Sequence, residues 1–166
     1  FYKEKVPGEF KDETIKQFVI EQLVDNRLWL MAAKDMGITV SDGDLREMIL
    51  QVPEFQKNGA FDPELYQRLL AANHLTPKVF EEAQTKEILG NKARMFVRDA
   101  VALTPPEISE GQALMTRQPD ADPAKATAAK DRVLQDMLYQ KQQRALVAFQ
   151  ESLKGKIPVK IHRELL

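Results

Sequence analysis

The sequence predicts an all-α fold of about six helices that ends in one long helix. Apolar residues recur at three- and four-residue spacings along most of the chain, as they do on amphipathic helices. Prolines follow Asp or Thr at apparent element boundaries, which is typical of a helix cap and a first-turn proline. These pairs are Asp62-Pro63, Thr76-Pro77, Thr104-Pro105 and Asp122-Pro123. No periodic repeat indicates a solenoid.

The first helix is expected from Glu13 to Met36, and Gly37 stands where a helix C-terminal stop belongs. Ser41, with an acidic residue three positions on, predicts a capping box that opens a short second helix. Pro53 should end that helix. The expected apolar positions of the two helices are Ile15, Phe18, Val19, Leu23, Leu28, Leu30 and Met31, then Leu45, Met48 and Ile49.

Residues 53–80 carry the densest set of boundary signals. Asn58-Gly59 predicts a turn, and Asp62-Pro63 predicts the start of a third helix that Asn73 can close. Thr76-Pro77 should begin a longer helix that runs to about Ala100. The buried face of the third helix is expected to hold Leu65, Tyr66, Leu69 and Leu70.

A short helix should follow Thr104-Pro105, and the longest helix should run from about Ala124 to Lys154, with Gly155 as its cap. At 1.5 Å per residue, the longest helix would measure roughly 45 Å. The tail IPVKI alternates apolar and polar residues and predicts a short terminal strand. We expect one domain, with the N-terminal helices in 1–117 and the closing helix and tail in 123–166.

Composition excludes several classes of protein. The chain has 24 basic and 25 acidic residues, interspersed, so nucleic-acid binding has little electrostatic support. It has no cysteine, which removes disulfides, thiol nucleophiles and cysteine-ligated metals. No apolar run approaches the roughly 20 residues of a membrane span, and no signal peptide is visible.

The sequence offers no pattern for catalysis. Its two histidines, His74 and His162, have no partner at catalytic spacing and are expected on the surface. Zinc-protease, phosphate-loop and dinucleotide fingerprints do not occur. We therefore expect no catalytic residue, no metal and no cofactor.

Apolar side chains are the better candidates for function. The six methionines suit an adaptable binding surface, although core packing explains most of them at their helical spacings. Aromatic residues flank the Asn58-Gly59 turn, where they form either a local core or the rim of a site, and Trp29 is either a core residue or an exposed anchor. The candidate residues for binding a polypeptide client are Met115, Phe55, Phe61, Tyr66 and Trp29.

The run FQKNGAFDPELYQRLLAANHLTPKVF, residues 55–80, resembles the SurA/PpiD-type periplasmic folding factors. The matching residues are Phe55, Gln56, Asn58, Gly59, Phe61, Asp62, Tyr66, Leu69, Leu70, Leu75, Thr76, Pro77 and Phe80. Residues 19–49, 103–109 and 138–161 resemble further parts of the same pattern. The resemblance implies a SurA N-terminal-like chaperone domain in the periplasm, whose long C-terminal helix packs back on the N-terminal helices.

Two departures from the family's pattern bear on function. Many members insert one or two parvulin-type prolyl isomerase domains before the final helix, whereas this chain has only about Gln118 to Asp122 there. The family's N-terminal strand is also missing, and the chain starts at Phe1-Tyr2-Lys3 as though upstream sequence had been removed. Apolar residues of this opening are expected to dock on the final helix or on a neighbouring chain, and a swapped homodimer is one alternative.

The resemblance implies an ATP-independent chaperone that holds unfolded or partly folded envelope and outer-membrane proteins in an apolar, helix-lined cradle. Two alternatives stay open. The chain could be the non-catalytic scaffold of a prolyl isomerase whose insert was lost near Arg117–Asp122. It could also be a helical assembly domain with one fixed partner.

Overall fold

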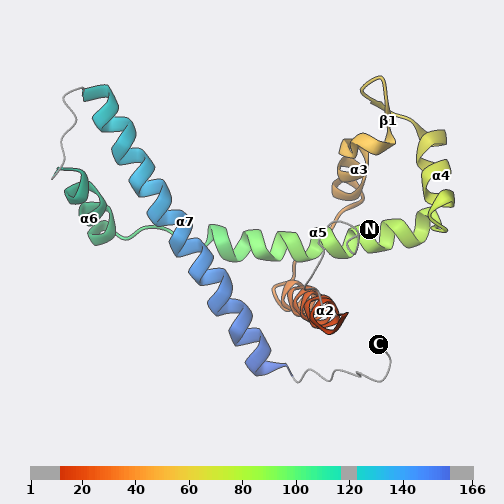
Figure 1. The fold of residues 1–166 in the computed structure, drawn as a ribbon, viewed down its shortest axis with the longest axis horizontal. Coiled ribbons are helices and arrows are strands. Elements are labelled where there is room, and N and C mark those ends of the chain that lie inside the picture. The colour runs from red at the N-terminus through yellow and green to blue at the C-terminus, as the bar shows by residue number, and fades with distance from the viewer. Residues whose placement is uncertain (1–11, 117–122, 158–166) are drawn as a thin grey trace. The chain divides into compact units, whose positions relative to one another are not determined.

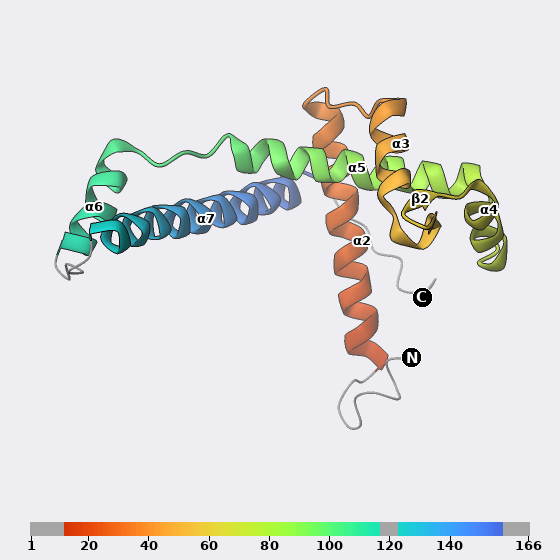
Figure 2. The same ribbon diagram turned by 90° about the horizontal axis from the view of Figure 1, so that it is seen from above.

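A computed structural model describes residues 12–116 and 123–157 of the chain (Figures 1 and 2). Six α-helices lie in these residues with one short 3-10 helix and a small hairpin, which confirms the predicted all-α fold. The elements are α2 (Asp12–Asp35), α3 (Asp42–Gln51), η1 (Pro53–Phe55), β1 (Gln56–Lys57), β2 (Ala60–Phe61), α4 (Pro63–Ala72), α5 (Pro77–Asp99), α6 (Pro105–Thr116) and α7 (Pro123–Lys156).

The described residues divide into two compact units, and the division falls within α5. The first unit holds residues 12–93 and the second holds residues 94–156. Each unit is described by itself below. The single domain with boundaries at 117 and 123, and the packing of the closing helix on the N-terminal helices, stay predictions.

The boundary between α2 and α3 follows the sequence signals. Gly37 has a φ of +70°, and the N–H of Ile38 donates to the carbonyl of Ala33 at 2.9 Å, so the predicted stop is confirmed. The predicted capping box is also present. Ser41 Oγ accepts from the N–H of Asp44 at 3.2 Å, and Asp44 Oδ2 accepts from the N–H of Ser41 at 2.8 Å.

The Asn58-Gly59 turn joins β1 to β2 in an antiparallel hairpin that pairs Gln56 with Phe61 and Lys57 with Ala60. Asn58 and Gly59 have φ values of 54° and 80°, the left-handed pair that a type I′ turn requires. The sequence predicts the turn but not the strands, because two residues on each side are too few for a visible alternation.

Asp62 begins α4 as predicted. Its Oδ1 accepts from the N–H groups of Glu64 and Leu65, each at 3.0 Å. At the other end, Asn73 Nδ2 donates to the carbonyl of Leu69 at 2.8 Å. Asn73 therefore closes α4 as predicted, although His74, with φ of 57°, is the residue that takes the left-handed conformation.

In the second unit, α6 and α7 pack side by side (Figures 1 and 2). Gly111 of α6 is buried against α7. The prediction that Gly155 caps α7 is wrong, because the helix continues through it to Lys156. The predicted terminal strand, from position 158 on, and His162 lie outside the described residues. The apolar residues of the chain's opening also lie outside them; they are Phe1, Tyr2, Val6 and Phe10.

Candidate functional site

An aromatic cluster forms the centre of the first unit, directly behind the Asn58-Gly59 turn. Phe55 meets Tyr66 edge-on at a centroid distance of 4.9 Å and meets Phe80 at 5.6 Å. The buried residues of this core are Ile49, Phe55, Tyr66 and Leu70, with Leu45, Met48, Val52, Phe61, Leu69 and Phe80 packed against them. The cluster thus joins α3, η1, α4 and the start of α5. Its side chains lie close in sequence to the turn and cap residues that mark the ends of these elements.

Tyr66 carries the cluster's one visible polar link to α5. Its hydroxyl donates to Glu81 Oε1 at 3.3 Å. Burial, together with the negative charge of Glu81, raises the pKa of Tyr66 to about 12. The hydroxyl therefore stays protonated at physiological pH and serves as a donor that positions the ring.

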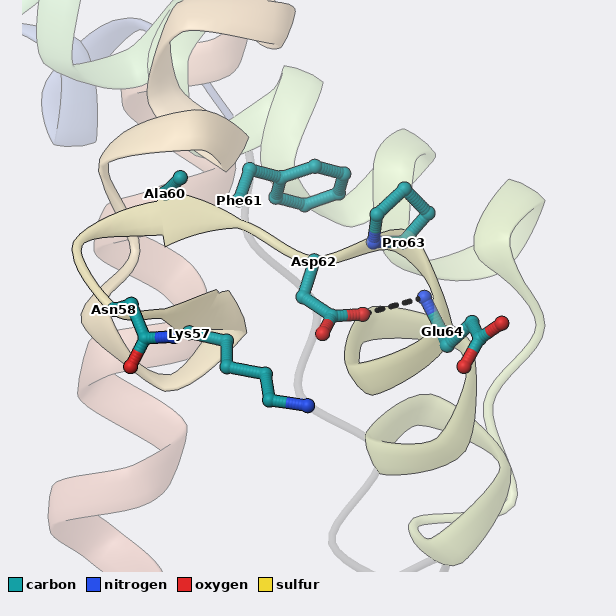
Figure 3. A pocket seen from close by; sticks show the side chains of 7 residues that line it. All are labelled: Lys57, Asn58, Ala60, Phe61, Asp62, Pro63 and Glu64. Carbon is teal, nitrogen blue, oxygen red and sulfur yellow. Dashed lines mark hydrogen bonds between the residues drawn. The ribbon is translucent and has the colours of Figure 1, made fainter.

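A pocket of about 560 Å³ opens on the outer side of the hairpin (Figure 3). It is lined by Lys57, Asn58, Ala60, Phe61, Asp62, Pro63 and Glu64. We call it the hairpin pocket. Its volume lies within the range of roughly 300–1,000 Å³ that is typical of ligand sites.

The candidate client-binding residues fall into three groups. Trp29, Phe55 and Tyr66 are only 3%, 7% and 8% exposed, which favours the core-packing alternative for them. Phe61 is half-buried, with one side toward Tyr66 and another on the hairpin pocket. The side chain of Met115 lies outside the described side chains. Client binding by these five residues stays a prediction.

The structure reveals an apolar surface on residues that the sequence analysis identified only as apolar positions of the first helix. Phe18, Val19 and Leu23 of α2 are 62%, 45% and 59% exposed. At 3.6 residues per turn they span about 140° of the helix, with Gln22 between Phe18 and Val19, so they lie on one side of the helix. We call this face the α2 stripe. Figure 2 shows the N-terminal half of α2 extending away from α3 of the same unit.

Farther along α2, the apolar residues are covered. Leu28 and Trp29 are 1% and 3% exposed, and Ala32 and Ala33 are buried with them. Ile20, on another side of the helix from the α2 stripe, is also buried at 8% exposed, so α2 is covered on one side there and more fully from Leu28 on. The only sequence signal along α2 is the helical spacing of its apolar residues. This spacing identifies a helix face but does not show which residues another element covers.

The capping box of α3 and the start of α6 are each reinforced by a lysine from another helix of the same unit. Lys92 of α5 donates to Asp44 Oδ2 at 2.7 Å, and Lys141 of α7 donates to Glu107 Oε2 at 2.7 Å. Glu107 Oε2 also accepts from the N–H and hydroxyl of Thr104. At each site the hydrogen bond from the lysine is the largest cause of a lowered carboxyl pKa, and the hydrogen bonds from Ser41 or Thr104 come next. The pKa of Asp44 is lowered strongly, and that of Glu107 is lowered to about 2.

Neither carboxylate is arranged for catalysis, since each is committed to a helix start and an ion pair. Within the described residues no cluster of His, Asp and Glu has the arrangement of a metal site. His74 lies exposed at the end of α4, as predicted. In the same part of the chain, no helix is long and apolar enough to cross a membrane. The arrangement that remains offers non-covalent binding through apolar surface.

Residues 2–94 match the SurA-like N-terminal domain family, which is more than half of the chain. The chain belongs to this family. The predicted resemblance is therefore confirmed. The match covers α2, α3, the hairpin, α4 and most of α5, so the aromatic cluster, the hairpin pocket and the α2 stripe all lie within the family domain.

Three relatives extend this comparison, and each is named periplasmic chaperone PpiD. The protein from Haemophilus influenzae is 36% identical over 62 residues, which is 37% of this chain and 10% of the relative. The Buchnera aphidicola protein is 32% identical over 76 residues, 46% of this chain and 12% of the relative. The Escherichia coli K12 protein is 25% identical over 117 residues, 70% of this chain and 19% of the relative.

The matched segments thus span less than a fifth of the length of each of these relatives. The 166 residues hold no parvulin-type isomerase domain, and residues 117–122 alone separate α6 from α7. The family and the names of the relatives confirm the predicted periplasmic location. No solved structure matches the chain.

Proposed function

We propose that this chain is an ATP-independent chaperone domain that binds unfolded or partly folded envelope proteins through exposed apolar helix faces. The α2 stripe is the observation that carries the proposal. Three large apolar side chains on one helix face are about half exposed or more, in a family whose relatives bear the name of a periplasmic chaperone.

Burial of apolar surface drives such binding. Each Å² removed from water contributes about 25 cal/mol before the cost of ordering the client is subtracted. An apolar helix face requires no particular sequence from its ligand, so one surface can serve many clients. Exposed methionine and aromatic side chains elsewhere in the described residues, including Met95 and Phe96 near the end of α5, enlarge the surface available to clients.

The test is suppression of aggregation. A urea-unfolded outer-membrane protein is diluted into buffer with and without the chain, and light scattering is followed. We expect the chain to lower scattering at near-equimolar ratios, and Phe18→Ser with Leu23→Ser to remove most of this effect. No suppression by the wild-type chain in large excess would overturn the proposal.

The matched control is Gln17→Ser with Glu21→Ser, because both positions are exposed on the same helix, lie outside the angular range of the stripe and take the same replacement. Circular dichroism verifies that both double variants keep their helix content. Equal loss of suppression in the two variants would show that a change in the stability of α2, and not the loss of the stripe's apolar side chains, causes the effect. Saturable one-to-one binding to a single folded protein, without any effect on unfolded clients, would instead identify a helical assembly domain.

A further inference from the structure

The hairpin pocket combines an apolar floor with three charged side chains, of which two, Lys57 and Glu64, make no hydrogen bond or ion pair with another described residue. Phe61, Ala60 and Pro63 supply the apolar lining. Phe61 is held in place, since its ring meets Tyr66 at a centroid distance of 5.7 Å and packs against the aromatic core. The floor is therefore a fixed feature of the first unit.

Lys57 and Glu64 provide the charges. Neither side chain makes a hydrogen bond or ion pair with another described residue, and both are exposed. Asp62, by contrast, uses Oδ1 to cap α4. Figure 3 shows Lys57 on the hairpin side of Asp62 and Glu64 on the helix side, so the pocket has a cationic end and an anionic end.

The positions of both charges are determined by backbone elements. Lys57 belongs to the pair that closes the type I′ turn, and Glu64 lies in the first turn of α4, directly after the cap. The N–H of Asp62 donates to the carbonyl of Phe55 at 2.8 Å, which fastens the hairpin to the helix start. Both ends of the pocket thus belong to one connected piece of structure.

We propose that the hairpin pocket binds extended client segments in which an acidic and a basic side chain flank an apolar one. The apolar side chain lies against Phe61 and Pro63, the acidic one pairs with Lys57, and the basic one pairs with Glu64. This inference rests on the proposed function and gives it a preference among clients, which the α2 stripe alone does not supply.

The experiment uses three fluorescent peptides of equal length that differ only in the charges on either side of a central phenylalanine. One carries an acid and a base, one carries two acids and one carries two bases. Wild type is expected to bind the mixed peptide best, by roughly two- to fivefold for each matched charge, as exposed ion pairs allow.

Charge reversal provides the decisive comparison. Lys57→Glu gives the pocket two anionic ends and should shift preference to the peptide with two bases. Glu64→Lys should shift preference to the peptide with two acids. Lys86→Glu is the matched control, because Lys86 is exposed on another helix, α5, and does not line the pocket, so its reversal should leave the order of the peptides unchanged.

The outcomes separate this inference from the function on which it rests. Equal binding of the three peptides by wild type and both pocket variants, with aggregation still suppressed, overturns the inference and leaves the chaperone function standing. The same shift in the Lys86→Glu control also overturns it, since net charge would then explain the effect. Absence of both peptide binding and suppression overturns the two proposals together.

Discussion

Individual residues with a left-handed backbone determine where this chain turns. Gly59 has a φ of +80° and no neighbouring atom within 4 Å of an added Cβ, so an alanine there would meet backbone strain and no clash. We expect Gly59→Ala to lower the free energy of unfolding by about 1 kcal/mol. Urea unfolding followed by circular dichroism measures the change.

Gly43 provides the matched control for that substitution. It lies in the first turn of α3, and the nearest atom to an added Cβ is Ser41 Oγ at 3.6 Å, an ordinary contact. Gly43→Ala should therefore leave stability unchanged or raise it by up to about 1 kcal/mol, because alanine favours the helix. Equal destabilisation by the two substitutions would contradict a backbone origin for the effect at Gly59.

The residue scale is also where sequence reasoning performed best. Ser41 and Asp62 act as caps because their short polar side chains accept from free N–H groups within three residues, and Glu107 accepts from the N–H of Thr104, interactions that depend only on local sequence. Gly155 shows the limit of the same reasoning. A glycine permits a helix to end but does not force it to, and α7 continues through it.

At the scale of the element, Glu107 in the first turn of α6 is paired with Lys141 of α7. Because the pKa of Glu107 is lowered from 4.5 to about 2 in the folded chain, its contribution to stability is fully present above pH 4.5. That contribution is lost as the pH falls from 4.5 toward 2. Glu107→Gln should lower stability at neutral pH and flatten the acid side of the stability curve. Thermal unfolding across this pH range tests both, and identical slopes for wild type and variant would contradict the assignment.

The contact between α6 and α7 depends on Gly111. A Cβ at this position would lie 2.8 Å from Leu134 Cδ2 and from Met137 Sδ, so both side chains must shift. We expect Gly111→Ala to destabilise the chain by up to about 1 kcal/mol, because the overpacking cost is partly offset by the helix propensity of alanine and the contacted ends of Leu134 and Met137 can move. Gly155→Ala, in open space within α7, should instead stabilise it by up to about 1 kcal/mol. Melting temperatures that rise for both variants would show that the side chains of α7 rearrange without loss of stability.

Sequence patterns predicted the existence of each helix but not the partner of each helix face. Phe18, Leu23 and Leu28 all belong to the apolar spacing of the first helix, and the pattern does not distinguish them. In the structure Leu28 is 1% exposed and Phe18 is 62% exposed. The difference arises from tertiary packing, which covers Leu28 but not Phe18. Local periodicity does not show which positions are covered. The α2 stripe therefore could not be predicted from the sequence, whereas the aromatic cluster, close to its boundary signals, could be.

At the scale of the whole molecule, charge balance bears on how clients are held. The chain carries 24 basic and 25 acidic residues, for a net charge of −1. Such a surface gives no strong field to steer a charged partner. Binding through the α2 stripe should then depend on apolar burial, while the hairpin pocket adds a short-range preference from two side chains.

These two contributions respond differently to salt. Screening lengths fall from about 10 Å at 0.1 M to about 3 Å at 1 M, so exposed ion pairs weaken while apolar burial does not. We expect suppression of aggregation to change little over this range, and the preference for the mixed-charge peptide to decline toward equal binding of the three peptides. In the same salt series, light scattering measures the suppression of aggregation, and fluorescence anisotropy measures the preference among the three peptides. Suppression that collapses with salt would mean that charge, and not the apolar face of α2, carries client binding.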